Sequence, residues 1–117
     1  MGNIENLDQI RAKNAFEACK NVQYKGENNG DVAKQIPEYI QGGGILGALA
    51  FALSKGEGYA KAFDAIAKHL SSIGKINAND AQMLQEKLLE CSPLELRDAT
   101  VETMLYLNYF RRFAKKQ

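Results

Sequence analysis

The most informative stretch of this sequence is residues 92–115, SPLELRDATVETMLYLNYFRRFAK. Ser92 is a preferred N-cap residue, Pro93 suits the first position of a helix, and Glu95 completes a capping box with the serine. Apolar and aromatic residues then recur at intervals of three and four, the period of an α-helix. The stretch therefore predicts a long helix that begins after Ser92 and ends near Lys115.

Two sides of this helix carry apolar or aromatic residues, one side more than a helix in a small monomer needs. The two stripes are Val101, Leu105, Asn108 and Arg112, and Tyr106, Phe110 and Phe113. Such a helix is either central in its own bundle or covered by another chain. Under the second interpretation, the aromatic stripe is a predicted interface with a neighbouring chain.

Helix-breaking residues divide the rest of the chain. The helices expected between the breaks cover residues 4–24, 31–41, 45–54, 59–72 and 79–91, with Asp31 and Asn79 as N-caps, Gly74 as a C-cap residue and a kink or break at Pro37. We interpret the glycine triplet at 42–44 as a sharp turn, with a phosphate contact at the next helix start as the alternative. The pattern predicts one all-α domain over residues 1–117, a compact bundle of five to six helices.

The composition excludes several classes of protein. The chain has 117 residues, of which 45% are hydrophobic and 25% are charged, values that suit one folded domain. We find no secretion signal at its start, and the longest apolar run, residues 45–53, is too short to cross a bilayer. We therefore expect a cytoplasmic protein without membrane contact.

Residues that carry catalytic or metal chemistry are scarce. The one histidine, His69, is expected to face solvent, and the isolated Cys19 and Cys91 are expected to be buried thiols. We find no nucleophile with a base beside it, no Gly-x-Ser-x-Gly motif and no metal-ligand spacing. The sequence predicts a binding protein and not an enzyme, with no metal ion and no cofactor.

Positive charge gathers at the C-terminus, where the last fifteen residues contain four basic side chains and no acidic one. Arg111, Lys115 and Lys116 are the predicted contacts to RNA phosphates, and Lys13 and Lys20 join them if the first and last helices are neighbours. The alternative is structural, because cations also complement the dipole at a helix C-terminus and lysines often form a solvated face.

Three polar residues lie on otherwise apolar stripes: Arg11, Asn108 and Arg112. An unpaired charge is costly in such a position. We expect these residues to be buried, with the guanidinium groups bound to helix-end carbonyls or to a carboxylate such as Asp8 or Asp98. The alternative is a groove wall that directs the guanidinium groups at phosphate.

Four segments match, in order, the sequence pattern of one known family. Arg11-Ala12 fits an Arg-Ala pair in its first helix, and Ile36-Pro37-Glu38-Tyr39-Ile40 is similar to its Leu-Pro-x-Met-Ile. Residues 43–51, GGILGALAF, are similar to its Asn-Gly-Leu-x-x-Ala-Leu-Ala-Phe, with Gly43 in place of a frequent Asn. Residues 100–114, TVETMLYLNYFRRFA, are similar to its last helix, which ends near Leu-Arg-Arg-Phe-Ala, with Tyr109 in place of a frequent Trp.

By these segments the chain resembles the small subunit of the type III-B CRISPR RNA-targeting (Cmr) complex. The resemblance implies a helical, non-catalytic antiviral subunit whose copies stack head to tail beside the subunits that hold the guide RNA. It also implies contacts to the backbone of the target RNA, with cleavage by neighbouring subunits. The expected partners are other subunits of the effector complex, guide and target RNA, and copies of this chain.

Two other functions remain as alternatives. A helical DNA-binding regulator needs a recognition helix that starts with polar and basic residues, whereas the candidate helices here start with Gly44-Ile45-Leu46 or Glu57-Gly58-Tyr59. A plain protein–protein adaptor would bind subunits without RNA. Sequence-specific duplex binding would support the regulator, and capture of CRISPR subunits would separate the adaptor from the RNA-contacting subunit.

Overall fold

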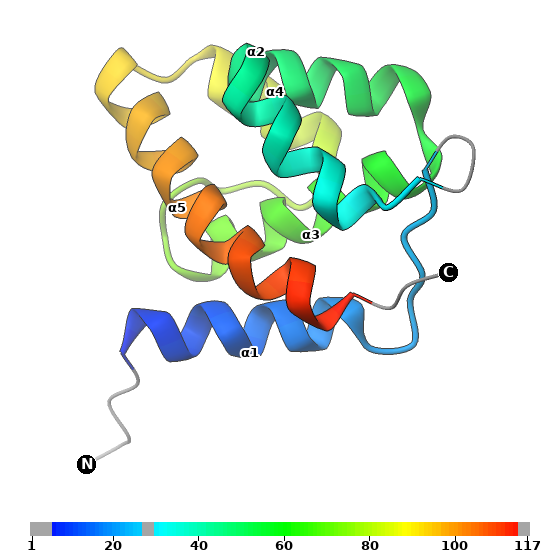
Figure 1. Cartoon of the computed structure of the whole chain (residues 1–117). Coiled ribbons are helices and arrows are strands. Elements are labelled where there is room, and N and C mark those ends of the chain that lie inside the picture. Colours follow the sequence, from blue (N-terminus) through cyan, green and yellow to red (C-terminus); the bar gives the residue numbers. More distant parts are fainter. Residues whose placement is uncertain (1–5, 27–29, 115–117) are drawn as a thin grey trace.

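Five α-helices dominate the residues that the structure, a computed structural model, describes, which are 6–26 and 30–114. The helices are α1, Leu7–Cys19; α2, Val32–Lys55; α3, Glu57–Ser72; α4, Ala81–Leu89; and α5, Pro93–Phe113. Over these residues the chain forms no strand beyond one isolated bridge between Lys25 and Asp31. The helices pack into one body in which α3 contacts all four others (Figure 1), which confirms the predicted all-α fold.

α5 begins where the sequence predicted. The Glu95 backbone N–H donates to the Ser92 hydroxyl at 3.1 Å, and the Ser92 backbone N–H donates to the Glu95 carboxylate at 2.9 Å. The bond from the Ser92 N–H holds the pKa of Glu95 below its usual value. The helix stops at Phe113, slightly before the predicted end, and the Ala114 N–H donates to the Phe110 carbonyl at 2.9 Å.

α5 buries one complete face between the other helices. α1 lies along one side of it, and α2 and α3 cover the other (Figure 1). Its buried residues are Ala99, Glu102, Thr103, Tyr106, Leu107 and Phe110. Tyr106 and Phe110 are 0% exposed, so the prediction that they contact a neighbouring chain is wrong, because they fill the core of their own chain.

Gly44 divides α2 into two helical halves. It has φ +80° and ψ +164°, a conformation that glycine adopts far more readily than other residues. The glycine triplet therefore makes the predicted turn, whereas the backbone at Pro37 stays helical. By length and composition α2 could cross a membrane, but in this fold residues from both halves, among them Ile36 and Leu49, lie in the core.

α1 is shorter than the predicted helix over residues 4–24. A capping box at Asn6 starts it, since the Gln9 backbone N–H donates to Asn6 at 2.7 Å and the Asn6 N–H donates to the Gln9 side chain at 3.1 Å. After Cys19 the chain turns and runs without helix to Lys25. The Gly58 N–H at the start of α3 donates to the Lys25 carbonyl at 3.1 Å, and a side chain at position 58 would collide with this backbone.

Two aspartates accept hydrogen bonds from the backbone at the start of α4. Asp80, and not the predicted Asn79, is the N-cap, and its carboxylate accepts from the Met83 N–H at 2.8 Å. Asp64 of α3 accepts from the Ala81 N–H at 2.7 Å. These bonds satisfy backbone donors that the first turn of a helix leaves unpaired, and the second bond fixes α4 to α3.

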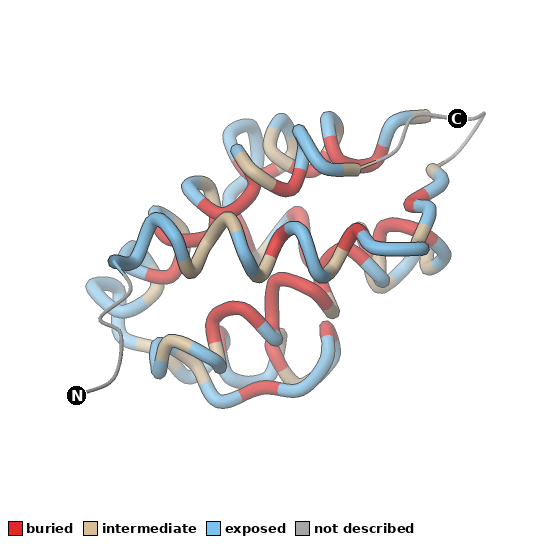
Figure 2. The backbone as a smooth tube through the Cα atoms, turned by 90° about the horizontal axis from the view of Figure 1, so that it is seen from below, coloured by how far each residue is buried: buried red, intermediate tan, exposed pale blue. Residues whose placement is uncertain are grey.

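Residues of all five helices form one hydrophobic core, and Figure 2 shows the buried positions in red along the backbone. Its largest fully buried apolar members come from α2 to α5: Ile36, Leu49, Tyr59, Phe63, Ile66, Leu70, Leu84, Leu88, Tyr106, Leu107 and Phe110. α1 contributes only Ala15 and Cys19 as buried residues. Cys19 is buried as predicted, whereas Cys91 is half-buried. Because α1 buries so few apolar residues, its attachment to the other helices depends on polar contacts as well.

Glu102 of α5 supplies the main polar contact between α1 and the bundle. This carboxylate is 3% exposed and accepts two hydrogen bonds from the Arg11 guanidinium of α1, both at 2.8 Å. His69 of α3 donates a third from Nε2, also at 2.8 Å. Burial alone would raise the pKa of Glu102, but the bonds from Arg11 and His69 together outweigh burial and hold the pKa below its usual value.

His69 is buried, so the expectation that it faces solvent is wrong. Because an ionised carboxylate only accepts hydrogen bonds, Nε2 of the ring carries the hydrogen, and Nδ1 accepts from the Asn14 amide at 2.9 Å. The ring also stacks on Tyr106, with ring centroids 4.4 Å apart. Burial lowers the pKa of His69, which keeps the ring neutral near pH 7.

Replacement of Glu102 by alanine is expected to lower the free energy of unfolding by about 3 kcal/mol, because Arg11 and His69 then lose their shared acceptor. Urea unfolding followed by circular dichroism measures this change. Glu86→Ala is the matched control, since Glu86 is exposed on α4, and it should stay within about 0.5 kcal/mol of the wild type. Equal losses at both positions would show that Glu102 does not hold the helices together.

Acid is expected to destabilise the fold through His69. Its pKa in the folded chain lies below the unfolded value, so between these two values the unfolded state binds more protons. Stability therefore falls as the pH drops below about 6.5, by at most about 1.4 kcal/mol per pH unit. The lowered pKa of Glu102 adds a second loss at lower pH, when this carboxylate becomes protonated in the folded chain.

The control for this pH dependence is His69→Gln, whose amide can still donate to Glu102 but does not titrate. His69 is the one histidine of the chain, so the variant should show nearly constant stability between about pH 7.5 and 5.5. Thermal unfolding at a series of pH values measures both proteins. The same slope in both would contradict the assignment to His69.

Candidate nucleic-acid interface

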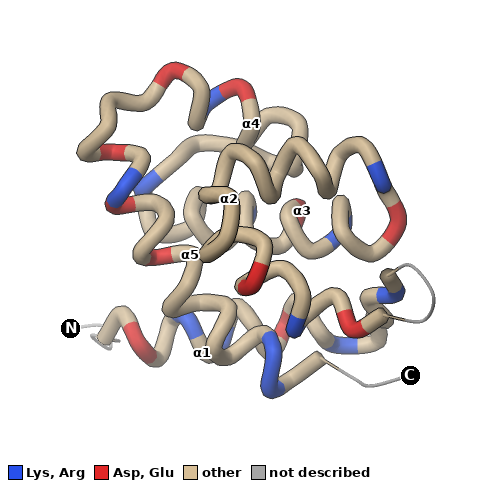
Figure 3. The backbone as a smooth tube through the Cα atoms, turned by 45° about the horizontal axis from the view of Figure 1, so that its top comes forward, with Lys and Arg blue, Asp and Glu red and all other residues tan. Residues whose placement is uncertain are grey.

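The C-terminal end of α5 and the first turn of α2 together form a positively charged pocket. Its volume is about 640 Å³, and its lining residues are Asp31, Lys34, Asn108, Arg111, Arg112 and Ala114. Figure 3 shows the basic residues at this end of α5. Three cations and one carboxylate line it, which gives it more net positive charge than the three other pockets described below.

The positive charge of the pocket comes from three side chains that lie near helix ends. Arg111 and Arg112 lie in the last turn of α5, where the helix end carries about half a negative charge that two full positive charges outweigh. Lys34 lies in the first turn of α2, an end that carries about half a positive charge. The three cations are exposed, and within the described residues no salt bridge occupies them, so their charge is available to an anion.

The structure brings together only some of the predicted RNA contacts. Arg111 lines the pocket, whereas Lys20 lines a smaller pocket elsewhere and Lys13 is exposed along α1. Lys115 and Lys116 lie outside the described residues. α1 and α5 are neighbours, as the sequence hypothesis required, but the cations that join Arg111 in the pocket are Arg112 and Lys34 of α2.

Asn108 and Arg112 are exposed, so the prediction that they are buried is wrong. The buried face of α5 contains Thr103, Tyr106 and Phe110, and a residue two positions further along a helix points about 200° away. The side of the helix with Asn108 and Arg112 therefore faces solvent and lines the pocket. The alternative of a groove wall describes these two residues better.

Arg11 is the one member of the predicted buried polar set that lies mostly inside the fold. Its side chain is 14% exposed and binds Glu102, which the sequence did not identify as a partner. Of the two carboxylates that were expected, Asp8 lies 3.7 Å from the guanidinium and is mostly exposed. The Glu102 hydrogen bond raises the pKa of Arg11, so this charge belongs to the core.

Phe113 is the one predicted interface residue that stays accessible. It is partly exposed and packs against Phe16 of α1, with ring centroids 5.5 Å apart and ring planes nearly perpendicular. The two rings, with Cys19, Lys20 and Asn21, enclose a pocket of about 200 Å³. The end of α5 thus has a charged side and an aromatic side.

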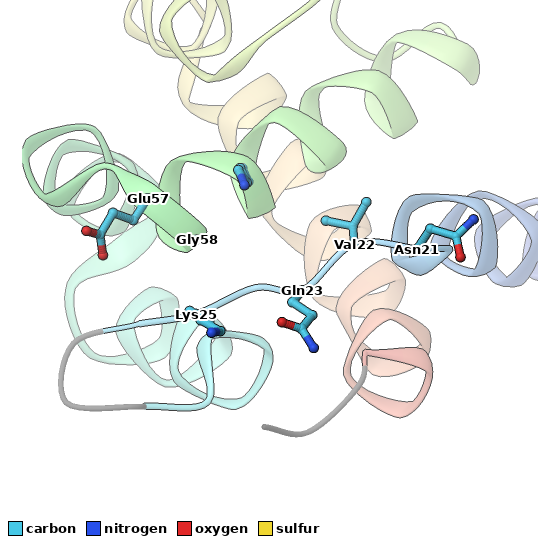
Figure 4. Close-up of a pocket in the computed structure, with 7 residues that line it drawn as sticks. Asn21, Val22, Gln23, Lys25, Glu57 and Gly58 are labelled. Atoms are coloured by element: carbon cyan, nitrogen blue, oxygen red, sulfur yellow. The ribbon is translucent and has the colours of Figure 1, made fainter.

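A larger pocket, of about 870 Å³, lies elsewhere, where the segment after α1 passes the start of α3. Figure 4 shows Asn21, Val22, Gln23 and Lys25 on that segment, opposite Glu57 and Gly58. Its charges are mixed, with Lys25 and Lys61 near Glu57. With two lysines and one carboxylate, this pocket has less net positive charge than the pocket at Arg111 and attracts a polyanion less.

The arrangement at Arg111 is suited to binding and not to bond cleavage. Guanidinium groups offer pairs of N–H donors that match phosphate oxygens. The described residues that line the pocket include no histidine, cysteine or serine that could act as a nucleophile or as its base. Within residues 6–26 and 30–114, no group of three His, Cys, Asp or Glu side chains could hold a metal ion.

Sequence reasoning missed Lys34 because it lies far from Arg111 along the chain. A weak signal existed, since Asp31 was identified as a helix start and Lys34 follows within the first turn. Nothing local to either segment, however, indicates that this helix start meets the end of α5. The packing of α2 against α5 supplies that information.

Comparison with known proteins agrees with this architecture. Residues 7–117 match the model of the family described as CRISPR-associated protein (Cas_Cmr5). The chain is 29% identical over 110 residues to the CRISPR system Cmr subunit Cmr5 of Thermus thermophilus, covering 92% of this chain and 91% of that protein. The crystal structure of a CRISPR-associated Cmr5 family protein from the same organism superimposes with a TM-score of 0.76 and 27% identity, covering 93% of this chain and 95% of that one. With nearly its whole length matched in sequence and in fold, this chain belongs to the CRISPR-associated Cmr5 family.

Proposed function

We propose that this chain is a non-catalytic small subunit of a type III-B CRISPR effector complex, in which it associates with copies of itself and contacts the backbone of the target RNA. Family membership supports the complex. The single observation that carries the RNA contact is the pocket in which Lys34, Arg111 and Arg112 converge. Lys115 and Lys116, which lie outside the described residues, add two more positive charges to the sequence three and four residues after Arg112.

Backbone recognition follows from the chemistry of the pocket. The arginine guanidinium groups and the lysine ammonium group bind phosphate oxygens, which every nucleotide presents. They therefore position an RNA strand without reading its sequence. A subunit that serves many guides needs this property, because pairing between guide and target supplies the specificity. Lys13 and Lys20 on α1 are secondary candidates for the same contact, on the other helix that packs against α5.

A non-catalytic role agrees with the state of the one histidine. Both ring nitrogens of His69 are engaged, Nε2 by Glu102 and Nδ1 by Asn14. A buried ring with both nitrogens bonded is not placed to take a proton from a nucleophile. In this proposal the other subunits of the complex hold the guide RNA and cleave the target, and the complex works in the cytoplasm without a membrane.

Charge reversal at the pocket is expected to weaken target binding. The double variant Arg111→Glu/Arg112→Glu, placed in the reconstituted effector complex, should lose about tenfold in affinity for target RNA for each phosphate contact removed. It should also lower the slope of log affinity against log salt by about one per contact. Filter binding with labelled target RNA at several salt concentrations measures both.

The control is Arg97→Glu, which makes one such charge reversal, half the total change of the double variant, at an exposed position near the other end of α5. It should leave affinity and salt slope close to the wild type. An equal loss in the control would assign the effect to net charge alone. If the Arg111/Arg112 variant kept its full affinity for target RNA at low salt, the pocket would not contact the RNA.

A further inference from the structure

The segment between α1 and α2 contains backbone groups that the fold leaves unpaired. Residues 22–25 run without helix past the start of α3 (Figure 4), and in this segment Val22 is half-buried, Tyr24 is buried, and Gln23 and Lys25 are exposed. This alternation is the period of an extended strand. Among the described residues, no hydrogen bond engages the backbone N–H or C=O of Val22 or Gln23, so the segment has the properties of a free strand edge.

The fold holds this edge in place. The Tyr24 hydroxyl donates to the Ala18 carbonyl at 2.6 Å, and the Tyr24 ring packs against Phe110 with ring centroids 4.8 Å apart. The Lys25 carbonyl accepts from the Gly58 N–H of α3 at 3.1 Å. Because the edge is already fixed, it loses little conformational entropy when a second strand pairs with it.

The unpaired backbone groups of Gln23 face the start of α3. Backbone groups of alternate residues in an extended chain point to the same side, and the Lys25 carbonyl points to Gly58 of α3. The N–H and C=O of Gln23 therefore point to that side as well, into the pocket of about 870 Å³ that Gln23 lines together with Lys61. A strand placed there can exchange two hydrogen bonds with Gln23.

A second pocket continues this space along α3. Its volume is about 640 Å³, and it shares Val22 and Lys61 with the first pocket. Together the two pockets, here called the α1–α3 groove, follow α3 from Glu57 to Ser72. α3 has 16 residues, so the groove is about 22 Å long, which an extended peptide of about seven residues spans.

The lining of the α1–α3 groove suits a peptide better than a nucleic-acid strand. Its charged residues are three lysines and three carboxylates: Lys25, Lys61, Lys68, Glu17, Glu57 and Asp64. Because these charges cancel, the groove has no net attraction for a phosphate backbone. Ala18, Val22 and Ala65 give the second pocket an apolar surface of small side chains, against which aliphatic side chains of an incoming strand can pack.

Asn14 adds a fixed hydrogen-bond acceptor to the second pocket. Its amide nitrogen donates to His69 Nδ1 and to Ser72 Oγ, both at 2.9 Å, which uses both hydrogens of that nitrogen. Its amide oxygen accepts no hydrogen bond from the described residues. Since Asn14 lines the pocket, this oxygen is available to a backbone N–H of a bound peptide.

We infer that the α1–α3 groove binds an extended peptide segment of a partner protein, which adds to residues 22–25 as a second strand. Main-chain hydrogen bonds with Gln23 supply affinity, and alternate aliphatic side chains of the peptide supply selectivity, as in β-strand addition. The groove shares no lining residue with the pocket at Arg111, so the chain can hold RNA and a peptide together. The inference goes beyond the proposed function and does not depend on RNA binding.

Selection of peptides on the isolated full-length chain tests this binding mode. The probe is a phage-displayed library of random dodecapeptides, from which enriched sequences are synthesised. We expect aliphatic residues at alternate positions of these sequences. In NMR spectra of the chain, a bound peptide should slow hydrogen exchange of the Gln23 amide by at least about tenfold, because this N–H becomes hydrogen-bonded.

Gln23→Pro removes the backbone N–H that the peptide needs as a donor, and Gln23→Ala is its matched control, because alanine keeps that N–H at the same exposed position. Isothermal titration calorimetry should show at least about fivefold weaker peptide binding by Gln23→Pro and unchanged binding by Gln23→Ala. Thermal unfolding verifies that both variants are folded. If the proline variant does not fold, hydrogen exchange in the wild-type chain decides.

Three results would overturn the inference: no enrichment over a mock selection, bound peptides that leave the Gln23 amide unprotected, or an equal loss of affinity in both variants. A short oligouridylate that protects the Gln23 amide, where the selected peptides do not, would assign the groove to nucleic acid instead. These measurements use the isolated chain. Their outcome is therefore distinguishable from a failure of the chain to enter the effector complex, which would contradict the proposed function alone.

Discussion

The arrangement of α1, α3 and α5 depends on the hydrogen bonds that the Glu102 carboxylate accepts. One buried carboxylate of α5 accepts hydrogen bonds from Arg11 of α1 and His69 of α3, and its ionised form satisfies both partners. α1 buries only Ala15 and Cys19 in the core, so the polar contact replaces much of the apolar burial that holds the other helices. A buried carboxylate without these partners would be strongly unfavourable, which ties the position of α1 to that of α3 and α5.

α5 is buried along one face in its middle, and its C-terminal end is accessible. Its middle is covered by α1, α2 and α3, and its aromatic side chains Tyr106 and Phe110 complete the core. The C-terminal end carries the arginines, next to Lys34 of α2. The proposed RNA contact therefore falls on the end of a helix whose middle is structural.

Local rules predicted those features whose causes are local. The capping box at Ser92, the break at the glycine triplet and the basic end of the chain each depend on a few consecutive residues, and each could be predicted from the sequence. The pairing of Glu102 with Arg11 and His69 could not, because it joins residues far apart in the chain. Asn108 and Arg112 were wrongly predicted to be buried for a related reason. The sequence of α5 contains two apolar stripes, and only the packing of α1 and α2 decides which of the two stripes is buried. The site was predicted at Arg111 but not at Lys34, which tertiary packing brings to it.

The central functional claim is that the C-terminal end of α5, with the start of α2, lies along the target RNA. Photochemical crosslinking of target RNA within the assembled complex, followed by mass spectrometry of the crosslinked peptides, tests it most directly. Crosslinks are expected on peptides that contain Lys34 or Arg111 and its C-terminal neighbours. Crosslinks confined to α3 and α4, or a complex in which this chain lies away from the RNA, would contradict it.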